Sequence, residues 1–304
     1  MVKGFWIGRR QAESFFRTQS DSSRTISYSI LDFSGGNMEK RICASIGLIL
    51  ALASMMSSAS CEESLQLTVF CGAGLSGAFN EIGQLYQTAS GIKVEFNFDG
   101  APALRAQIEQ GAYADLLACA DYKHMNALRA EGYINNSTVR TFAENEMAVV
   151  VPLHNPANIL CLADLARPGT LVLMGTLELP AGYHAREALS KLANDSEYGT
   201  DYRDKVMANI VSQETTVNRI VSKVALGEAD AGFAFASDVS PAMVGKVNKI
   251  SIPDRCNVAV DFPIGALIQS SNPREAQNFI DLVMSPQGQA VLEKYEFIPA
   301  AAMD

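Results

Sequence analysis

Strand-forming runs alternate with helical periods in the chain beyond residue 65, and this order constrains the fold more than any other feature. Leu67–Phe70 predicts a strand, and 78–89 predicts a helix because Phe79, Ile82 and Tyr86 fall on one stripe. Two more strand–helix pairs follow, at 92–98 with 103–110 and at 115–118 with 122–131. A β-α-β-α-β-α order predicts a parallel, doubly wound sheet.

A second α/β unit follows, with strands predicted at 171–174 and 231–235 and helices at 185–194 and 217–226. Long β runs at 146–152 and 259–268 flank this unit, and we interpret them as crossovers between two lobes. We therefore expect an α/β protein with two lobes, joined by two β crossovers, and a ligand cleft between the lobes. The expected lobe 1 is 62–147 plus 259–304, and the expected lobe 2 is 148–258. Two helices, at 273–279 and 286–294, are expected to pack on the outside.

Residues 38–61 have the order of an export signal peptide. Lys40 and Arg41 are followed by an apolar run from Ile46 to Met56, by small residues and by Cys61. The run is shorter than the roughly 20 residues of a membrane-spanning helix. It also lacks the polar face that a core helix would show. We therefore expect the mature chain to be exported and to work in the periplasm or another extracytoplasmic space.

Residues 1–37 precede this signal, although a signal sequence normally begins a protein. We expect translation to start at Met38 instead of Met1, which makes 1–37 a non-translated or disordered extension. Cys61 follows small residues, but Ser58 stands where the lipid-attachment motif prefers leucine. Two interpretations of Cys61 stay open: a lipid-modified first residue, or an unmodified cysteine near an ordinary cleavage site.

The charge of the exported part excludes some partners. Without the seven Lys and Arg and the four Asp and Glu that precede Cys61, the totals of 24 and 33 become 17 and 29, a formal charge of −12. Nucleic acids and anionic membranes bind basic surfaces. We therefore expect neither as a partner.

Cysteine and histidine spacing gives no metal or catalytic motif. The cysteines beyond residue 61 are Cys71, Cys119, Cys161 and Cys256. The first two end apolar runs and are expected in the core, whereas the last two fall in predicted surface turns and are the pair in which we expect any disulfide. The histidines are His124, His154 and His184, expected at the surface because no H-E-x-x-H or G-x-S-x-G motif accompanies them.

Four predicted helix starts lie where a cleft between the lobes would be lined. They are the segments 71–76, 99–102, 179–182 and 214–217. Helix N-termini offer free N–H groups and a partial positive charge, so four of them around one cleft would hold an oxyanion without any Lys or Arg. Each segment taken alone is also compatible with an ordinary turn before a helix.

Six segments occur in an order that is specific when they are taken together: LTVFCGAGLSGAF, IKVEFNFDGAPALRAQIEQGAYADLLACAD, NPANILCLADLARPG, LPAGYHAREAL, ALGEADAGFAFASDV and SPQGQAVLEKYEF. In this order the chain from Leu67 to Pro299 resembles the periplasmic molybdate-binding proteins of ABC transporters, which are two-lobed type II solute-binding proteins. The resemblance implies a monomer without enzymatic activity or cofactor. It implies capture of molybdate or tungstate and delivery to a membrane permease after the lobes close.

The resemblance places five oxyanion-binding positions on Gly74, Ala101, Ala181, Val217 and Phe235. The family usually has serine at the first two positions and tyrosine at the last, so three hydroxyl donors are missing here. Each lost hydrogen bond to a charged ligand is worth roughly 1.5–3 kcal/mol. Backbone N–H groups remain at the first four positions.

Several polar residues near these positions are candidates to replace the missing donors. They are Ser76, Ser237 and Thr216, and Glu178 is a further possible ligand. Glu178 lies one residue from a carboxylate position of a related tungstate-binding group. We expect the other nearby acids, Asp99 and Glu214, to serve in turns and caps.

Two alternative functions stay open. The loss of three hydroxyls makes the expected pocket less polar, which favours a larger or less charged solute on the same fold. A sensor or an enzyme on this scaffold would use Cys71 or His184 as its reactive group.

Overall fold

The computed structural model describes residues 65–239, 241 and 243–300, which lie in one compact unit, Glu63–Asp304. The predicted signal peptide, Cys61 and the segment before Met38 lie outside the described residues. Within those residues the strands form one mixed sheet with the path β2-β1-β3-β9-β4-β7-β5-β6, and β8 and β10 pair with β4 off this path. None of the helices described is both long and apolar enough to cross a membrane.

One half of the sheet carries the first α/β unit. Its elements are β1 (Gln66–Gly72), η1 (Ala73–Leu75), α2 (Ser76–Ser90), β2 (Lys93–Asp99), α3 (Ala101–Glu109), β3 (Leu116–Ala118), α4 (Tyr122–Ala130) and η2 (Asn136–Thr138). The strands β2 and β3 both run parallel to β1, as predicted. Phe79, Ile82 and Tyr86 are buried on α2, and Gly91 ends the helix because its φ of 75° suits a residue without Cβ.

The other half carries the second α/β unit. Its elements are η3 (Leu162–Ala166), β5 (Val172–Gly175), α5 (Pro180–Asn194), α6 (Tyr202–Ala208), β6 (Ile210–Glu214), α7 (Val217–Ala225), β7 (Ala231–Phe235), η4 (Ala236–Asp238) and β8 (Val247–Ser251). The strands β6 and β7 run parallel to β5. The sequence patterns missed α6, β6 and β8, which are short and have few buried residues.

Two long strands join the halves, β4 (Arg140–Pro152) and β9 (Ala259–Ala266). Residues 140–146 of β4 pair with β9, whereas 147–152 pair with β7 and β8. Asn257 fixes the backbone of β4 where its pairing partner changes. The Asn257 side chain accepts from the Met147 N–H and donates to the Met147 carbonyl. The two predicted crossover strands are therefore confirmed, while the lobe boundaries at 147/148 and 258/259 stay a prediction.

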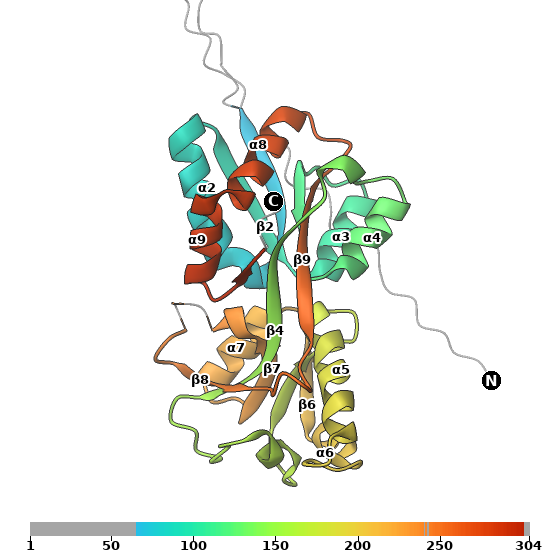
Figure 1. Cartoon of the computed structure of the whole chain (residues 1–304), viewed down its shortest axis with the longest axis vertical. Helices are drawn as coiled ribbons and strands as arrows, with labels where there is room; N and C mark the ends of the chain where they lie inside the picture. The colour runs from blue at the N-terminus through green and yellow to red at the C-terminus, as the bar shows by residue number, and fades with distance from the viewer. Residues whose placement is uncertain (1–64, 240, 242, 301–304) are drawn as a thin grey trace, which may run out of the picture. The chain divides into compact units, whose positions relative to one another are not determined.

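The sheet as a whole is mixed, because the crossover strands β9 and β4 run antiparallel to their neighbours. Figure 1 shows both strands passing through the middle, with α2, α3 and α4 at one end of the sheet and α5, α6 and α7 at the other. The chain finishes at the first end with α8 (Pro273–Met284), α9 (Pro286–Lys294) and β10 (Ile298–Pro299). Phe279 of α8 packs against Phe79 and Tyr86 of α2.

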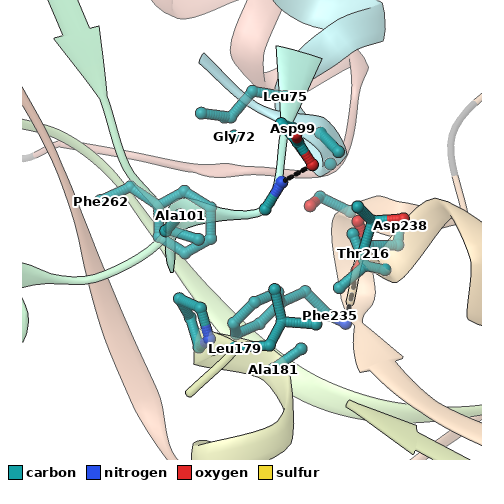
Figure 2. A pocket seen from close by; sticks show the side chains of 17 residues that line it. Gly72, Leu75, Asp99, Ala101, Leu179, Ala181, Thr216, Phe235, Asp238 and Phe262 are labelled. Atoms are coloured by element: carbon teal, nitrogen blue, oxygen red, sulfur yellow. Dashed lines mark hydrogen bonds between the residues drawn. The ribbon is translucent and has the colours of Figure 1, made fainter. Parts of the chain in front are cut away.

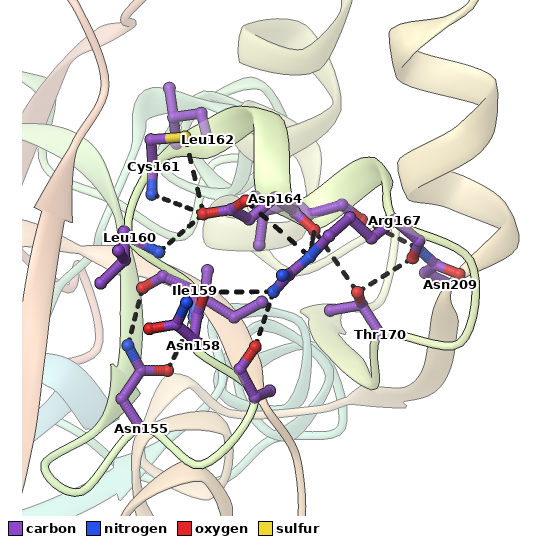
Figure 3. Close-up of polar contacts among 12 residues, drawn as sticks. Asn155, Asn158, Ile159, Leu160, Cys161, Leu162, Asp164, Arg167, Thr170 and Asn209 are labelled. Carbon is purple, nitrogen blue, oxygen red and sulfur yellow. Dashed lines mark hydrogen bonds and ion pairs between the residues drawn. The ribbon is translucent and has the colours of Figure 1, made fainter.

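The predicted disulfide between Cys161 and Cys256 is wrong: both thiols are free, with Cys161 exposed and Cys256 buried. Each thiol contacts a different carboxylate, because Cys161 Sγ lies 3.6 Å from Asp164 Oδ2 and Cys256 Sγ lies 3.5 Å from an oxygen of Asp195. Figure 3 shows that Asp164 also accepts the N–H groups of Leu160 and Cys161. The turn that holds Cys161 is thus fixed by hydrogen bonds instead of a covalent bond.

Candidate functional site

A cavity of about 400 Å³, including its open mouth, lies where the loops of the two halves meet. Figure 2 shows side chains that line it. The lining residues are Gly72, Ala73, Gly74, Leu75, Asp99, Gly100, Ala101, Ala120, Leu179, Pro180, Ala181, Thr216, Val217, Phe235, Ser237, Asp238 and Phe262. No Lys, Arg or His is among them.

Loops from opposite ends of the sheet touch beside this cavity. The strands β2 and β6 are the two outermost strands of the sheet path, yet a Cβ built on Gly100, after β2, would overlap the carbonyl oxygen of Thr215, after β6. The Asn218 side chain of α7 also donates to the carbonyl of Ala73, at a distance of 3.1 Å. Only a residue without a side chain fits at position 100 in this closed arrangement.

Three helices begin at the cavity without a side-chain cap. The N-cap residues of α3, α5 and α7 are Gly100, Leu179 and Thr216, and none of them makes a capping hydrogen bond. The first N–H groups of a helix have no acceptor within it. Ala101, Ala181 and Val217 lie in these first turns and line the cavity. The partial positive charge of a helix start therefore lies beside the cavity at three places.

Two hydroxyls add to these backbone donors. Asn145 donates to Ser237 Oγ at 2.6 Å, and because a hydroxyl has a single proton, that of Ser237 stays available to a ligand. Thr216 stands at the N-cap position of α7, but its side chain makes no capping bond. The carboxylate of Asp99 has the expected turn role, since its Oδ1 accepts the N–H of Gly100 at 2.7 Å. Glu214 is not a cap, because its carboxylate pairs with Lys223 Nζ at 2.6 Å.

The remaining wall is apolar. The rings of Phe235 and Phe262 meet edge to face with their centroids 5.3 Å apart. Leu179 and Val217 are also nearly fully buried beside them. Apolar walls exclude water and strengthen each hydrogen bond made to a charge inside the cavity.

All five positions that the family resemblance indicated line this cavity: Gly74, Ala101, Ala181, Val217 and Phe235. Of the additional candidates, Thr216 and Ser237 also line the cavity, whereas Ser76 and Glu178 lie elsewhere. Ser76 lines a neighbouring groove with Gly77 and Asn218. The side chain of Glu178 is 63% exposed and pairs with Lys123 at 2.7 Å.

Sequence patterns placed Leu179 in the expected lining but missed two other lining residues, Phe262 and Asp238. Phe262 lies within a β run that was predicted only as a crossover, and Leu179 precedes the proline of α5. Asp238 lies in the segment ALGEADAGFAFASDV, which was the one signal that pointed toward it. Its position against Gly74 depends on tertiary contact and is not visible in sequence spacing.

The residues proposed for a reactive group have unsuitable surroundings. Burial raises the pKa of the Cys71 thiol well above its usual value, so the nucleophilic thiolate is disfavoured. His184 is half-buried and lies 3.8 Å from Asp121, outside the cavity lining. His124 was expected at the surface but is buried, where its Nε2 lies 2.9 Å from the carbonyl oxygen of Glu178. Within the described ranges, no cluster of His, Cys, Asp and Glu is placed to hold a metal ion.

Comparison with known proteins gives consistent matches. A family model described as bacterial extracellular solute-binding protein matches residues 67–298. The molybdate-binding protein ModA of Mycobacterium tuberculosis is 32% identical over 232 residues, covering 76% of this chain and 84% of that protein. A putative ABC transporter substrate-binding lipoprotein of Bacillus subtilis, YvgL, is 29% identical and covers 82% and 93%. Among solved structures, the periplasmic molybdate-binding protein of Azotobacter vinelandii superposes with a TM-score of 0.68 at 18% identity, covering 77% of this chain and all of that chain.

Proposed function

Because the chain belongs to the bacterial extracellular solute-binding protein family, we propose that it captures molybdate or tungstate for an ABC importer. The cavity between the loops of the two halves is the proposed binding site. The ligand set is the backbone N–H groups of Gly74, Ala101, Ala181 and Val217, with the ring of Phe235 as an apolar wall.

The observation that carries this proposal is the convergence of three uncapped helix starts on a cavity that no basic side chain lines. A tetrahedral oxyanion presents oxygens in several directions, and separate helix starts supply N–H donors from several directions. Selectivity then depends on the size of the cavity and the number of donors. A basic side chain would instead attract any anion.

Two hydroxyls offset the three that the family positions lack. The Ser237 hydroxyl is oriented by Asn145. The Thr216 hydroxyl lies at the start of α7 and makes no capping hydrogen bond. A hydrogen bond to a charged ligand contributes roughly 1.5–3 kcal/mol, so two replacements recover much of the loss. This set differs from the family's usual one and predicts an affinity that depends on Ser237.

The wider role follows from the family. We propose that residues 38–61 direct export, that Cys61 is the site at which a lipid anchor would attach, and that the loaded monomer docks on a membrane permease. We propose no catalytic role. The related lipoprotein of Bacillus subtilis supports the lipid anchor.

An alternative solute has one observation in its favour, the apolar wall formed by Phe235 and Phe262. A larger or less charged solute would use this wall more than a small dianion does. The absence of any Lys or Arg from the lining is compatible with both solutes.

Isothermal titration calorimetry on the purified protein with molybdate, tungstate and sulfate tests the proposal. We expect one-to-one binding of molybdate or tungstate and at least about tenfold weaker binding of sulfate, which is smaller. Ser237→Ala is expected to weaken molybdate binding by about tenfold or more. Absence of heat with molybdate and tungstate would refute the proposed ligand and favour the alternative solute.

A further inference from the structure

Asp238 is a buried carboxyl at the cavity with one oxygen unused. Its side chain is 7% exposed, and its Oδ2 accepts the N–H of Phe235 at 2.8 Å. Its Oδ1 is buried and has no hydrogen-bond partner among the described residues. An unpaired polar atom in the interior is costly, so a partner missing from the free protein is expected there.

The unused oxygen lies against Gly74. A Cβ built on Gly74 would be 2.5 Å from Asp238 Oδ1 and 3.1 Å from a methyl group of Val217. The carboxyl therefore occupies the space in which a side chain at position 74 would begin. Figure 2 shows Asp238 at the cavity beside Thr216. A side chain at position 74 would require the Asp238 carboxyl to shift from its observed position.

The charge on Asp238 is set by burial. The elements packed against η4 are η1, α7 and β4, and η1 carries no titratable side chain. The charged residues of the other two are Arg140, Glu144, Glu146, Arg219 and Lys223. None of these perturbs Asp238: desolvation raises the pKa of its carboxyl to about 7, and the Phe235 N–H opposes this rise. Across the cavity, Asp99 is turned toward the N–H of Gly100.

We propose that Asp238, as a neutral acid, donates a hydrogen bond from Oδ1 to the bound oxyanion and so replaces the hydroxyl missing at Gly74. This inference rests on the proposed oxyanion function. An ionised carboxylate would repel a dianion, whereas a neutral carboxylic acid in apolar surroundings is a donor. Asp238 is thus a ligand-binding residue in addition to the five positions that the family resemblance indicates.

Binding is then coupled to a proton. Below about pH 7 the free protein already carries the proton on Asp238, so binding takes up none. Above about pH 7 the free carboxyl is ionised and must be protonated when the oxyanion enters. The affinity for molybdate therefore falls as the pH rises, by up to about tenfold per pH unit, with uptake of up to one proton.

Calorimetry with molybdate from about pH 6 to about pH 9, in two buffers of different ionisation enthalpy, measures this uptake. Asp238→Asn is the matched variant, because its amide keeps an acceptor for the Phe235 N–H and offers a donor that does not titrate. We expect the wild type to show proton uptake above about pH 7 and Asp238→Asn to bind at all pH values without uptake. Gly74→Ala fills the same space without a donor and is expected to weaken binding by about tenfold or more.

Two results distinguish a failure of the Asp238 proposal from a failure of the proposed oxyanion function. If the wild type binds molybdate with no proton uptake at any pH, Asp238 is not the donor, and the proposed function stands. If the wild type binds neither molybdate nor tungstate at any pH, the proposed function itself fails. Because the proton count is read from the wild type, misfolding of either variant leaves the test intact.

Discussion

Three helices that begin at the cavity differ from α4 and α9, which begin elsewhere, in how their first N–H groups are satisfied. The start of α4 is capped by Asp121, which accepts the N–H of Lys123, and the start of α9 is capped by Ser285, which accepts the N–H of Gly288. At the cavity, α3, α5 and α7 have no such bond. The starts of α6 and α8, away from the cavity, also lack a side-chain cap. What sets α3, α5 and α7 apart is that all three begin at one cavity, where, in our account, the oxyanion is the cap.

Side-chain charge follows the same division. Beside the cavity, α4 and the start of α5 meet through Lys123 with Glu178 and through Asp121 with His184. Inside it, the lining has two carboxyls and no basic group. Polar side chains therefore contact each other across the two halves next to the site, while in our account backbone dipoles bind the ligand in the site itself.

The largest expected effect comes from Gly182→Ala, which breaks the uncapped start of α5. A Cβ there would overlap the backbone of Gly175 and Thr176, and backbone cannot move aside as a flexible side chain can. We expect the free energy of unfolding to fall by about 3 kcal/mol, measured by urea denaturation. Ser190→Ala on the same helix is the control, since the Ser190 hydroxyl bonds only to the Arg186 carbonyl. Equal stability of both variants would contradict this packing.

Adding a charged cap at the cavity is the second test. Thr216→Asp should cap α7 and leave the protein as stable or more stable, because aspartate is a preferred N-cap residue. Its charge beside a dianion should weaken molybdate binding at least about 100-fold, or about 2.7 kcal/mol. Thr216→Asn caps without a charge and should lose less affinity. Tight binding by the aspartate variant in calorimetry would mean that the α7 start does not face the ligand.

Removing a cap away from the cavity should have the opposite signature. Asp121→Ala is expected to lower the free energy of unfolding by about 1 kcal/mol and to change molybdate affinity by less than about threefold. Asp121→Asn keeps an acceptor for the Lys123 N–H and should be closer to wild type in thermal denaturation. A large loss of affinity without loss of stability would place Asp121 in the binding machinery.

The smallest effect is expected at the exposed pair of Lys123 and Glu178. Both side chains are substantially exposed, at 42% and 63%, so solvent screens their attraction. The Lys123 ammonium lowers the pKa of the Glu178 carboxyl. Lys123→Met and Glu178→Gln should each change molybdate affinity by less than about twofold. A loss of tenfold or more in Glu178→Gln would restore Glu178 as a ligand candidate.

The strand and helix order of the first unit was predictable because its main elements carry apolar residues at regular spacing. In α2, for example, the buried residues recur at helical spacing. In the second unit, β6 exposes alternate residues at the sheet edge and α6 has seven residues, so neither gives a strong pattern. The antiparallel direction of β4 and β9 depends on how the chain returns between the halves, which periodicity does not encode.

The site divides in the same way. Gly74, Ala101, Ala181, Val217 and Phe235 all sit beside turns or strand ends that local sequence signals mark, and they all line the cavity. The proposed binding role of Asp238 was not predictable from local sequence. It depends on a tertiary contact with Gly74, which lies 164 positions earlier and leaves room for the carboxyl. The buried His124 was missed for a similar reason, since its partner is the carbonyl of Glu178 on the other half.

The central claim is that the oxyanion is held by uncapped helix starts and not by basic side chains. Its most direct test is the anomalous difference map of a crystal grown with molybdate and measured at the molybdenum absorption edge. We predict one peak in the cavity, with its oxygens within hydrogen-bond reach of the N–H groups of Ala101, Ala181 and Val217 and no Lys or Arg in contact. A peak outside the cavity, or one held by basic side chains, would contradict the claim.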